Sequence, residues 1–263
     1  MAKAMDDGGL VSVRALQLAA QVRAQGHAPS GRAEQVTRQL ESAIALGLLN
    51  PGERLPPESV MAEHLGVSPL TLRQSLAVLR SKGLLYTRRG RGGGSYVTGI
   101  VAVREAEIAR ELRNYRSDDL RDLIDLAAAT AGSAARLASK RSDEQDVRRL
   151  RSLGARFASS SEAHMLRQSD ARLHVGLGVA AQSRRLTSLL IQIHAELTPL
   201  TWGEQWQDEQ VNAVREHESL LGSIERGDAA AAEEVAIAHF EREGAVIINQ
   251  HLALLTSDLA DQR

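Results

Sequence analysis

Three histidines and one aspartate in the second half of the chain have the types and spacing of a divalent metal site. Asp170 and His174 are four residues apart, so both side chains project from one face of a predicted helix. His217 and His239 are twenty-two residues apart, with Gly227-Asp228 midway between them. If the chain turns there into an antiparallel helical hairpin, the two imidazoles lie at the same height. Imidazole and carboxylate ligands without thiolates suit Zn²⁺, Ni²⁺ or Mn²⁺.

Isolated histidines are more often hydrogen-bonded structural residues than metal ligands. The chain has eight histidines in all, so the presence of a histidine alone indicates little. We interpret the histidines outside the predicted metal site as structural residues: His27, His64, His164, His194 and His251.

A second group of residues could contact nucleic acid. No acidic residue occurs between Glu63 and Glu105, whereas seven arginines and lysines do. Three polar side chains lie in the first turns of one predicted helix: the hydroxyls of Ser68 and Thr71 and the guanidinium of Arg73. They can reach phosphates or base edges. The hydroxyl of Ser68 also suits the helix N-cap, and it can serve both roles. Arginines beside flexible glycines could contact the DNA backbone or minor groove, and these are Arg88, Arg89 and Arg91.

The pattern around these residues predicts a winged helix-turn-helix. Apolar residues recur with helical spacing over 34–46, a second short helix is expected from Pro56 to Gly66, and a third begins with Pro69 in its first position and stops at Gly83. Two alternating segments, 84–88 and 95–98, flank a basic, glycine-rich stretch that is typical of a β-hairpin tip. The third helix is then the one that enters the major groove of double-stranded DNA.

Beyond residue 100 the strand signals disappear. We therefore predict a mainly α protein, in which a winged helix-turn-helix precedes an all-α bundle of six or seven helices. The expected divisions are a flexible extension over 1–33, the DNA-binding domain over 34–100 and a ligand-binding domain over 101–257. The segments with helical spacing are 102–114, 118–140, 143–157, 162–181, 183–201, 208–226 and 229–255.

Composition fits this organisation. Aromatic residues make up only 3% of the chain, while alanine and leucine supply most of its apolar content, which favours helices packed on helices. The chain has no cysteine, so disulfides and thiolate metal sites are excluded. No stretch has the length of a signal peptide's apolar core or of a membrane span. We expect a cytoplasmic protein with no membrane partner.

The stretch from Ile44 to Val97 resembles the GntR family of transcription regulators. The matching motifs, in order, are Gly47-Leu48-Leu49-Asn50-Pro51-Gly52-Glu53-Arg54-Leu55-Pro56-Pro57-Glu58, Leu65-Gly66-Val67-Ser68, Leu72-Arg73-Gln74-Ser75-Leu76 and Gly83-Leu84-Leu85. The resemblance adds Arg54 to the expected DNA contacts. It implies a homodimer on an approximately palindromic operator, acting as a repressor. The family usually has arginine directly after the serine, where this chain has Pro69, so relatives' operator preferences do not carry over.

Residues 105–255 resemble the FadR-type C-terminal (FCD) domain. Asp170 and the three histidines of the predicted site fall on that family's metal pattern. The resemblance also implies that Arg121 faces the cavity and, together with the metal, holds a small carboxylate effector. Arg121 could instead pair with Asp122 or Asp125 on the surface. Ser183 stands where relatives often carry asparagine.

Two alternatives remain open at this point. An aspartate with three histidines and an open metal position also describes a metal-dependent hydrolase, although the chain has no His-Glu-x-x-His motif. The metal could also be purely structural, in which case no ligand would control DNA binding.

Overall fold

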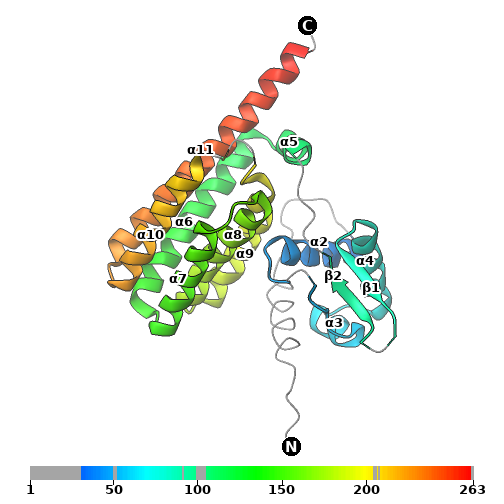
Figure 1. The fold of residues 1–263 in the computed structure, drawn as a ribbon. Helices are drawn as coiled ribbons and strands as arrows, with labels where there is room; N and C mark the ends of the chain where they lie inside the picture. The colour runs from blue at the N-terminus through cyan, green and yellow to red at the C-terminus, as the bar shows by residue number, and fades with distance from the viewer. Residues whose placement is uncertain are drawn as a thin grey trace, which may run out of the picture. The chain divides into compact units, whose positions relative to one another are not determined.

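A computed structural model describes residues 31–49, 52–90, 92–98, 105–203, 206 and 208–261 (Figure 1). The chain divides into two compact units, Met1–Val101 and Ala102–Arg263. The predicted mainly α fold is confirmed, because the described residues form helices and one two-stranded sheet. Most of the predicted N-terminal extension, residues 1–30, lies outside the described residues.

In the part that the structure describes, the first unit is a three-helix core with a β-hairpin. Its elements are α2 (Arg32–Ala45), α3 (Glu58–Leu65), α4 (Pro69–Ser81), β1 (Leu85–Arg88) and β2 (Gly94–Val97). The strands pair antiparallel from Leu85 opposite Val97 to Arg88 opposite Gly94. Buried leucines of α4, among them Leu72 and Leu76, pack with residues of α2 and the hairpin in one apolar core. The expected winged helix-turn-helix is therefore present.

Helix α4 begins and ends as its sequence indicates. The backbone N–H of Thr71 donates to Ser68 Oγ at 3.1 Å, and Pro69 occupies the first helical position, where no N–H is needed. Gly83 follows the helix with a φ of 72°, a conformation that costs glycine little. These local signals fix which side chains α4 exposes at its N-terminal end.

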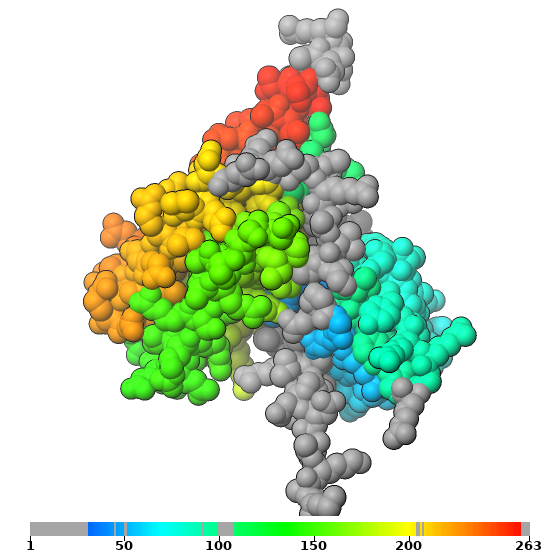
Figure 2. Space-filling view, viewed as in Figure 1, coloured from blue at the N-terminus to red at the C-terminus, as the bar shows by residue number. Residues whose placement is uncertain are grey.

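The second unit is a helical bundle. Its elements are α5 (Glu105–Asn114), α6 (Ser117–Arg141), α7 (Glu144–Ala158), α8 (Ala163–Ala180), α9 (Arg184–Leu197), the 3₁₀ turn η1 (Thr198–Leu200), α10 (Glu209–Glu225) and α11 (Ala229–Asp261). Helix α8 is buried over most of its length. Figure 2 shows α7 in green and the α10–α11 turn region in orange on the outside of this unit. None of the described helices is long and apolar enough to cross a membrane.

Helices α6 and α11 pack closely because glycines lie at their contact. A Cβ added to Gly132 of α6 would lie 2.7 Å from Ile237, and one added to Gly244 of α11 would lie 2.3 Å from Ile124. Side chains larger than hydrogen at these points would force the helices apart. This contact fixes the position of α11, which carries part of the candidate site.

The later part of α11 is joined to α5 and to the start of α6. His251 is buried, and its two ring nitrogens lie 3.0 Å from the Leu112 carbonyl and 3.1 Å from Ser117 Oγ. Arg113 donates to Asp258 at 2.8 Å. His251 thus has the structural role that its isolation in the sequence suggested.

Candidate metal centre and nucleic-acid interface

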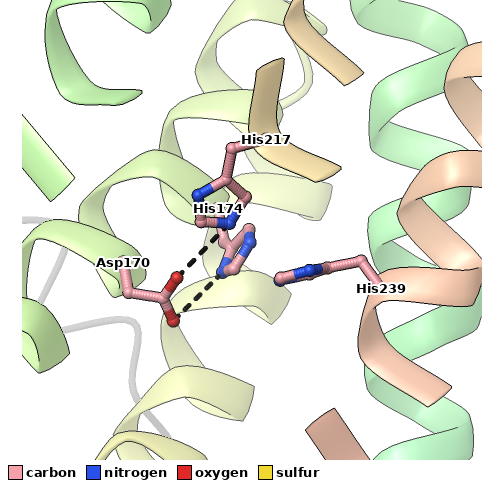
Figure 3. A group of neighbouring side chains, drawn as sticks. All are labelled: Asp170, His174, His217 and His239. Carbon is pink, nitrogen blue, oxygen red and sulfur yellow. Dashed lines mark ion pairs between the residues drawn. The ribbon is translucent and has the colours of Figure 1, made fainter. Parts of the chain in front are cut away.

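The structure brings together the four side chains that the sequence predicts as metal ligands. Asp170 and His174 come from α8, His217 from α10 and His239 from α11 (Figure 3). All four are buried, and one possible ligand atom from each lies within 4.8 Å of the others. The α10–α11 hairpin turns at Gly227, whose φ is 72°, and it brings the rings of His217 and His239 to a centroid distance of 4.7 Å.

The spacing of these atoms suits a single ion. Asp170 Oδ1 lies 3.4 Å from His217 Nε2, and Asp170 Oδ2 lies 3.7 Å from His174 Nδ1. Two ligand atoms that bind one zinc ion, each at about 2.1 Å, lie about 3.0 to 3.4 Å apart in octahedral or tetrahedral geometry. These two separations match or slightly exceed this range, whereas the four ligand atoms as a set lie within 4.8 Å of one another, so the side chains would move closer together on binding one ion.

The same side chains carry polar atoms that the protein leaves unsatisfied. Asp170 Oδ1, His239 Nε2 and both ring nitrogens of His174 and His217 are buried and have no hydrogen-bond partner. Leaving one such group unpaired costs about 1–3 kcal/mol. A divalent cation would satisfy several of them at once, so the residues fit a metal ion.

Glu216 and Arg242 orient one of the ligands. Glu216 Oε2 lies 2.7 Å from His239 Nδ1, and Arg242 donates to both oxygens of Glu216, at 2.7 and 2.6 Å. When Nδ1 carries the proton and donates it to Glu216, the lone pair of Nε2 faces the cluster. Sequence analysis missed both residues, although Glu216 directly precedes His217 and Arg242 follows His239 by three.

Burial keeps the imidazoles neutral. It lowers the pKa of His174 and His217 well below the usual value. Neighbouring histidines lower the pKa of His174 further, and His239 does so for His217, where Glu216 opposes the shift. Burial also lowers the pKa of His239, although the hydrogen bond to Glu216 opposes the shift. Neutral imidazoles are the form that binds metal.

The pKa values of the carboxyl groups near the site shift in opposite directions. Burial raises the pKa of Asp170 to about 7, against the opposing influence of Trp202 and of the Arg242 charge. Burial, and then the charge of Asp170, raises the pKa of Glu243 well above its usual range. For Glu216, burial would raise the pKa, but the hydrogen bonds from His239 and Arg242 lower it to about 2. Glu216 is therefore an anion, whereas Asp170 is mostly protonated below about pH 7 and must release that proton there to bind a cation.

A narrow cavity adjoins the cluster. Asp170, His194 and Glu243 line it together with apolar residues that include Ile124 and Phe240. His194 is stacked on His174 with ring centroids 5.1 Å apart, and burial lowers its pKa to about 3. The sequence indicates only a structural role for His194, because its distance along the chain from the other histidines does not reveal that it lies beside the cluster.

Arg121 does not lie where the family resemblance suggests. Its side chain is 58% exposed, and it donates to Asp118 at 3.3 Å on the outer face of α6. The face that α6 buries carries Leu120, Ile124 and Ala127 instead. The expectation that Arg121 faces the cavity is wrong for this structure, because its position around α6 directs it to solvent.

The expected DNA contacts lie at the surface of the first unit. Ser68, Arg73, Arg88 and Arg89 are exposed, while Thr71 is half-buried and hydrogen-bonded to Ser68. Arg73 forms an exposed ion pair with Glu58 at 2.8 Å, which leaves its guanidinium free to exchange partners at little cost. Arg91 lies outside the described residues.

Arg54 has a structural partner. Its guanidinium donates to the carbonyl of Gly93, and its backbone bridges to Tyr96 of β2. It thereby fastens the hairpin to the segment before α3. Any contact that Arg54 makes with DNA would be additional to this role.

Comparison with known proteins gives matches over both units. The family model described as "Bacterial regulatory proteins, gntR family" matches residues 32–94, and the FCD domain model matches residues 122–242. The chain is 34% identical over 229 residues, 85% of its length, to a Mycobacterium gastri protein named as an HTH-type transcriptional regulator, RmpR, of which the match covers 82%. It is 26% identical over 227 residues to the Uxu operon transcriptional regulator of Escherichia coli, covering 79% and 83% of the two chains. The solved structure of E. coli McbR/YncC matches with a TM-score of 0.47 at 18% identity, over 84% of this chain and 99% of that one.

Proposed function

This chain belongs to the GntR family of bacterial regulatory proteins and is a DNA-binding transcription regulator rather than an enzyme, and we propose that it is a repressor whose second unit senses a small ligand through a bound metal. One observation carries the sensing part of this proposal. Four side chains from three helices meet in the core with ring nitrogens and a carboxylate oxygen that have no protein partner.

The metal we propose is one divalent transition ion per chain, Zn²⁺, Ni²⁺ or Mn²⁺. Asp170, His174, His217 and His239 would hold it, and Glu216 would keep the ring of His239 in place. Because the ligands come from α8, α10 and α11, binding would stabilise the folded unit over the unfolded chain.

The ligand we propose is a small carboxylate metabolite. The bound ion would supply a positive charge and an open position for a carboxylate oxygen. His194 lines the adjoining cavity and is neutral over the physiological range, so it can hydrogen-bond an anion without adding charge. Arg121 takes no part, because it points to solvent.

DNA binding is assigned to the first unit. Ser68, Thr71 and Arg73 at the start of α4 would enter the major groove, and Arg88, Arg89 and Arg91 would contact the backbone or minor groove. One such helix reads few base pairs, so two copies of the chain on an approximately palindromic operator are expected.

Elemental analysis tests the metal assignment. Wild type should retain about one transition metal ion per chain, and His239→Ala should retain little. His164→Ala is the matched control, because it makes the same substitution on α8 at a residue outside the cluster. Equal metal in wild type and His239→Ala would overturn the assignment.

Removal of the metal separates a sensor from a purely structural site. In a sensor, the chelated protein keeps its helical circular dichroism and its operator binding, but loses its response to carboxylates in a thermal-shift screen. Loss of helicity on chelation would instead favour the structural alternative.

A further inference from the structure

Glu243 is a buried acid that the proposed metal site does not use. Glu243 is 4% exposed, and its Oε1 makes no hydrogen bond. It lies one helical turn beyond His239 on α11, with Oε1 3.3 Å from His239 Nε2. No lysine or arginine is among the residues that line the cavity beside it.

The apolar residues around Glu243 do not explain why an acidic side chain is buried there. Ile124, Phe240 and Ile247 line the same cavity, and a carboxylate placed among such groups without a partner is strongly disfavoured. The nearby guanidinium of Arg242 already binds Glu216 and Glu209. The imidazoles of the cluster are neutral, so the charge that compensates a Glu243 carboxylate would come from the ion that we propose there, next to His239 Nε2.

The geometry points to Glu243 as a fifth protein ligand of the metal, occupying the position that a carboxylate effector needs. This inference rests on the proposed metal-sensing function. The distance of 3.3 Å to His239 Nε2 falls within the range of about 3.0 to 3.4 Å for two atoms bound to one ion. Close packing of Gly244 against Ile124 holds this turn of α11 in place, so the carboxylate stays at the edge of the cluster.

Two consequences follow for this chain. Three imidazoles and two carboxylates exceed the four ligands of a tetrahedral zinc site, so the site favours ions that accept five or six ligands. Around an ion that accepts five ligands, an incoming carboxylate must displace Glu243, which makes the protein's own side chain a competitor of the effector. Glu243 thereby sets how much effector is needed for a response.

The test uses the full-length protein loaded with Co²⁺, whose visible absorption is weak with five or six ligands and stronger with four. Glu243→Gln keeps the size of the side chain and removes its charge. Glu241→Gln is the matched control, because it makes the same change at an exposed residue of α11. Competition with a chromophoric chelator gives the affinity of each variant for the ion.

Glu243→Gln should bind Co²⁺ about 10- to 100-fold more weakly than wild type and absorb more strongly. Glu241→Gln should match wild type. The melting temperature of metal-free Glu243→Gln should equal or exceed that of wild type, because a buried acid has been neutralised, and this shows that the variant is folded. Wild-type affinity together with a wild-type spectrum in Glu243→Gln would overturn the ligand assignment.

Acetate tests the competition. It should perturb the Co²⁺ spectrum of Glu243→Gln at lower concentration than that of wild type. If both proteins need the same acetate concentration for this spectral change, acetate and Glu243 do not compete for one position on the ion. Wild type that binds no Co²⁺ at all would overturn the metal-sensing function itself, which is distinguishable from a wild type that binds Co²⁺ without help from Glu243.

Discussion

We expect Asp170, and not the histidines, to set the pH dependence of metal affinity at the proposed site. An unperturbed imidazole has a pKa of about 6.5, so the composition of the site alone would predict proton competition at three histidines below about pH 6. The structure alters this expectation. Burial holds His174 and His217 neutral well below that pH, whereas it raises the pKa of Asp170 to about 7. At pH 5 the metal-free site should therefore carry neutral rings at His174 and His217 and a protonated Asp170, and binding of a cation must release the Asp170 proton.

The size of the effect follows from linkage. With one group of pKa about 7, the affinity should fall about 90-fold between pH 8 and pH 5, or about 2.7 kcal/mol. Three imidazoles at their ordinary pKa would instead lower it about 30,000-fold over the same interval. The sign is the same in both cases, because acid opposes binding, but the slopes differ by a factor that is easily measured.

The assay is a Zn²⁺ titration against a chromophoric chelator at half-unit steps of pH, corrected for protonation of the chelator. A slope of one proton below pH 7 is expected from Asp170. If Glu243 is a ligand, its release of a second proton steepens the curve, and Glu243→Gln should restore the slope of one. If the logarithm of Zn²⁺ affinity instead changes with pH by three protons around pH 6.5, or does not change at all, the assignment to Asp170 is refuted.

Three further predictions concern other parts of the molecule. Arg73→Ala should weaken operator binding by about 1–3 kcal/mol in a gel-shift titration, or erase site preference, and unchanged affinity and preference would remove Arg73 from the contacts. Light scattering at micromolar concentration should find a homodimer, and a monomer both free and with operator would contradict the two-half-site arrangement. Gly244→Ala should destabilise the second unit by about 1–3 kcal/mol, because the new methyl group would lie 2.3 Å from Ile124. Gly222→Ala is its control, since a Cβ there meets the movable ends of two side chains, Arg226 at 3.1 Å and Arg151 at 4.0 Å. Equal melting temperatures for the two variants would contradict the packing argument.

Local signals explain why so much of the fold is predictable from sequence. Ser68 and Pro69 start α4 and Gly83 ends it through contacts and dihedral angles within a few residues. The four metal-binding candidates are predictable for a related reason. One pair follows from helical spacing and the other from its equal distance from the turn at Gly227, and the resemblance to the FCD domain selects these four residues among the eight histidines and many acids.

The residues that sequence analysis missed depend on tertiary burial. Glu216, Arg242 and Glu243 are charged residues on helices, and such residues usually face solvent. Their inward position is decided by how α10 and α11 are rotated against α8, which spacing within one helix does not reveal. Arg121 shows the opposite error, because a family pattern suggested the cavity while the apolar repeat of Leu120 and Ile124 on α6 directs it outward.

One helix connects the metal centre to the start of the second unit. His239 and His251 are twelve residues apart on α11, a distance of about 18 Å along a rigid helix. At its later position α11 is hydrogen-bonded to the last turn of α5, through Leu112, and to the beginning of α6, through Ser117. Helix α5 is the first helix after the DNA-binding unit. If a bound metal or effector displaces α11 at His239, this displacement must either move α5 or break the contacts of the buried His251, which is costly. If the effector leaves α11 in place, its binding would not be transmitted to α5 through the hydrogen bonds of His251.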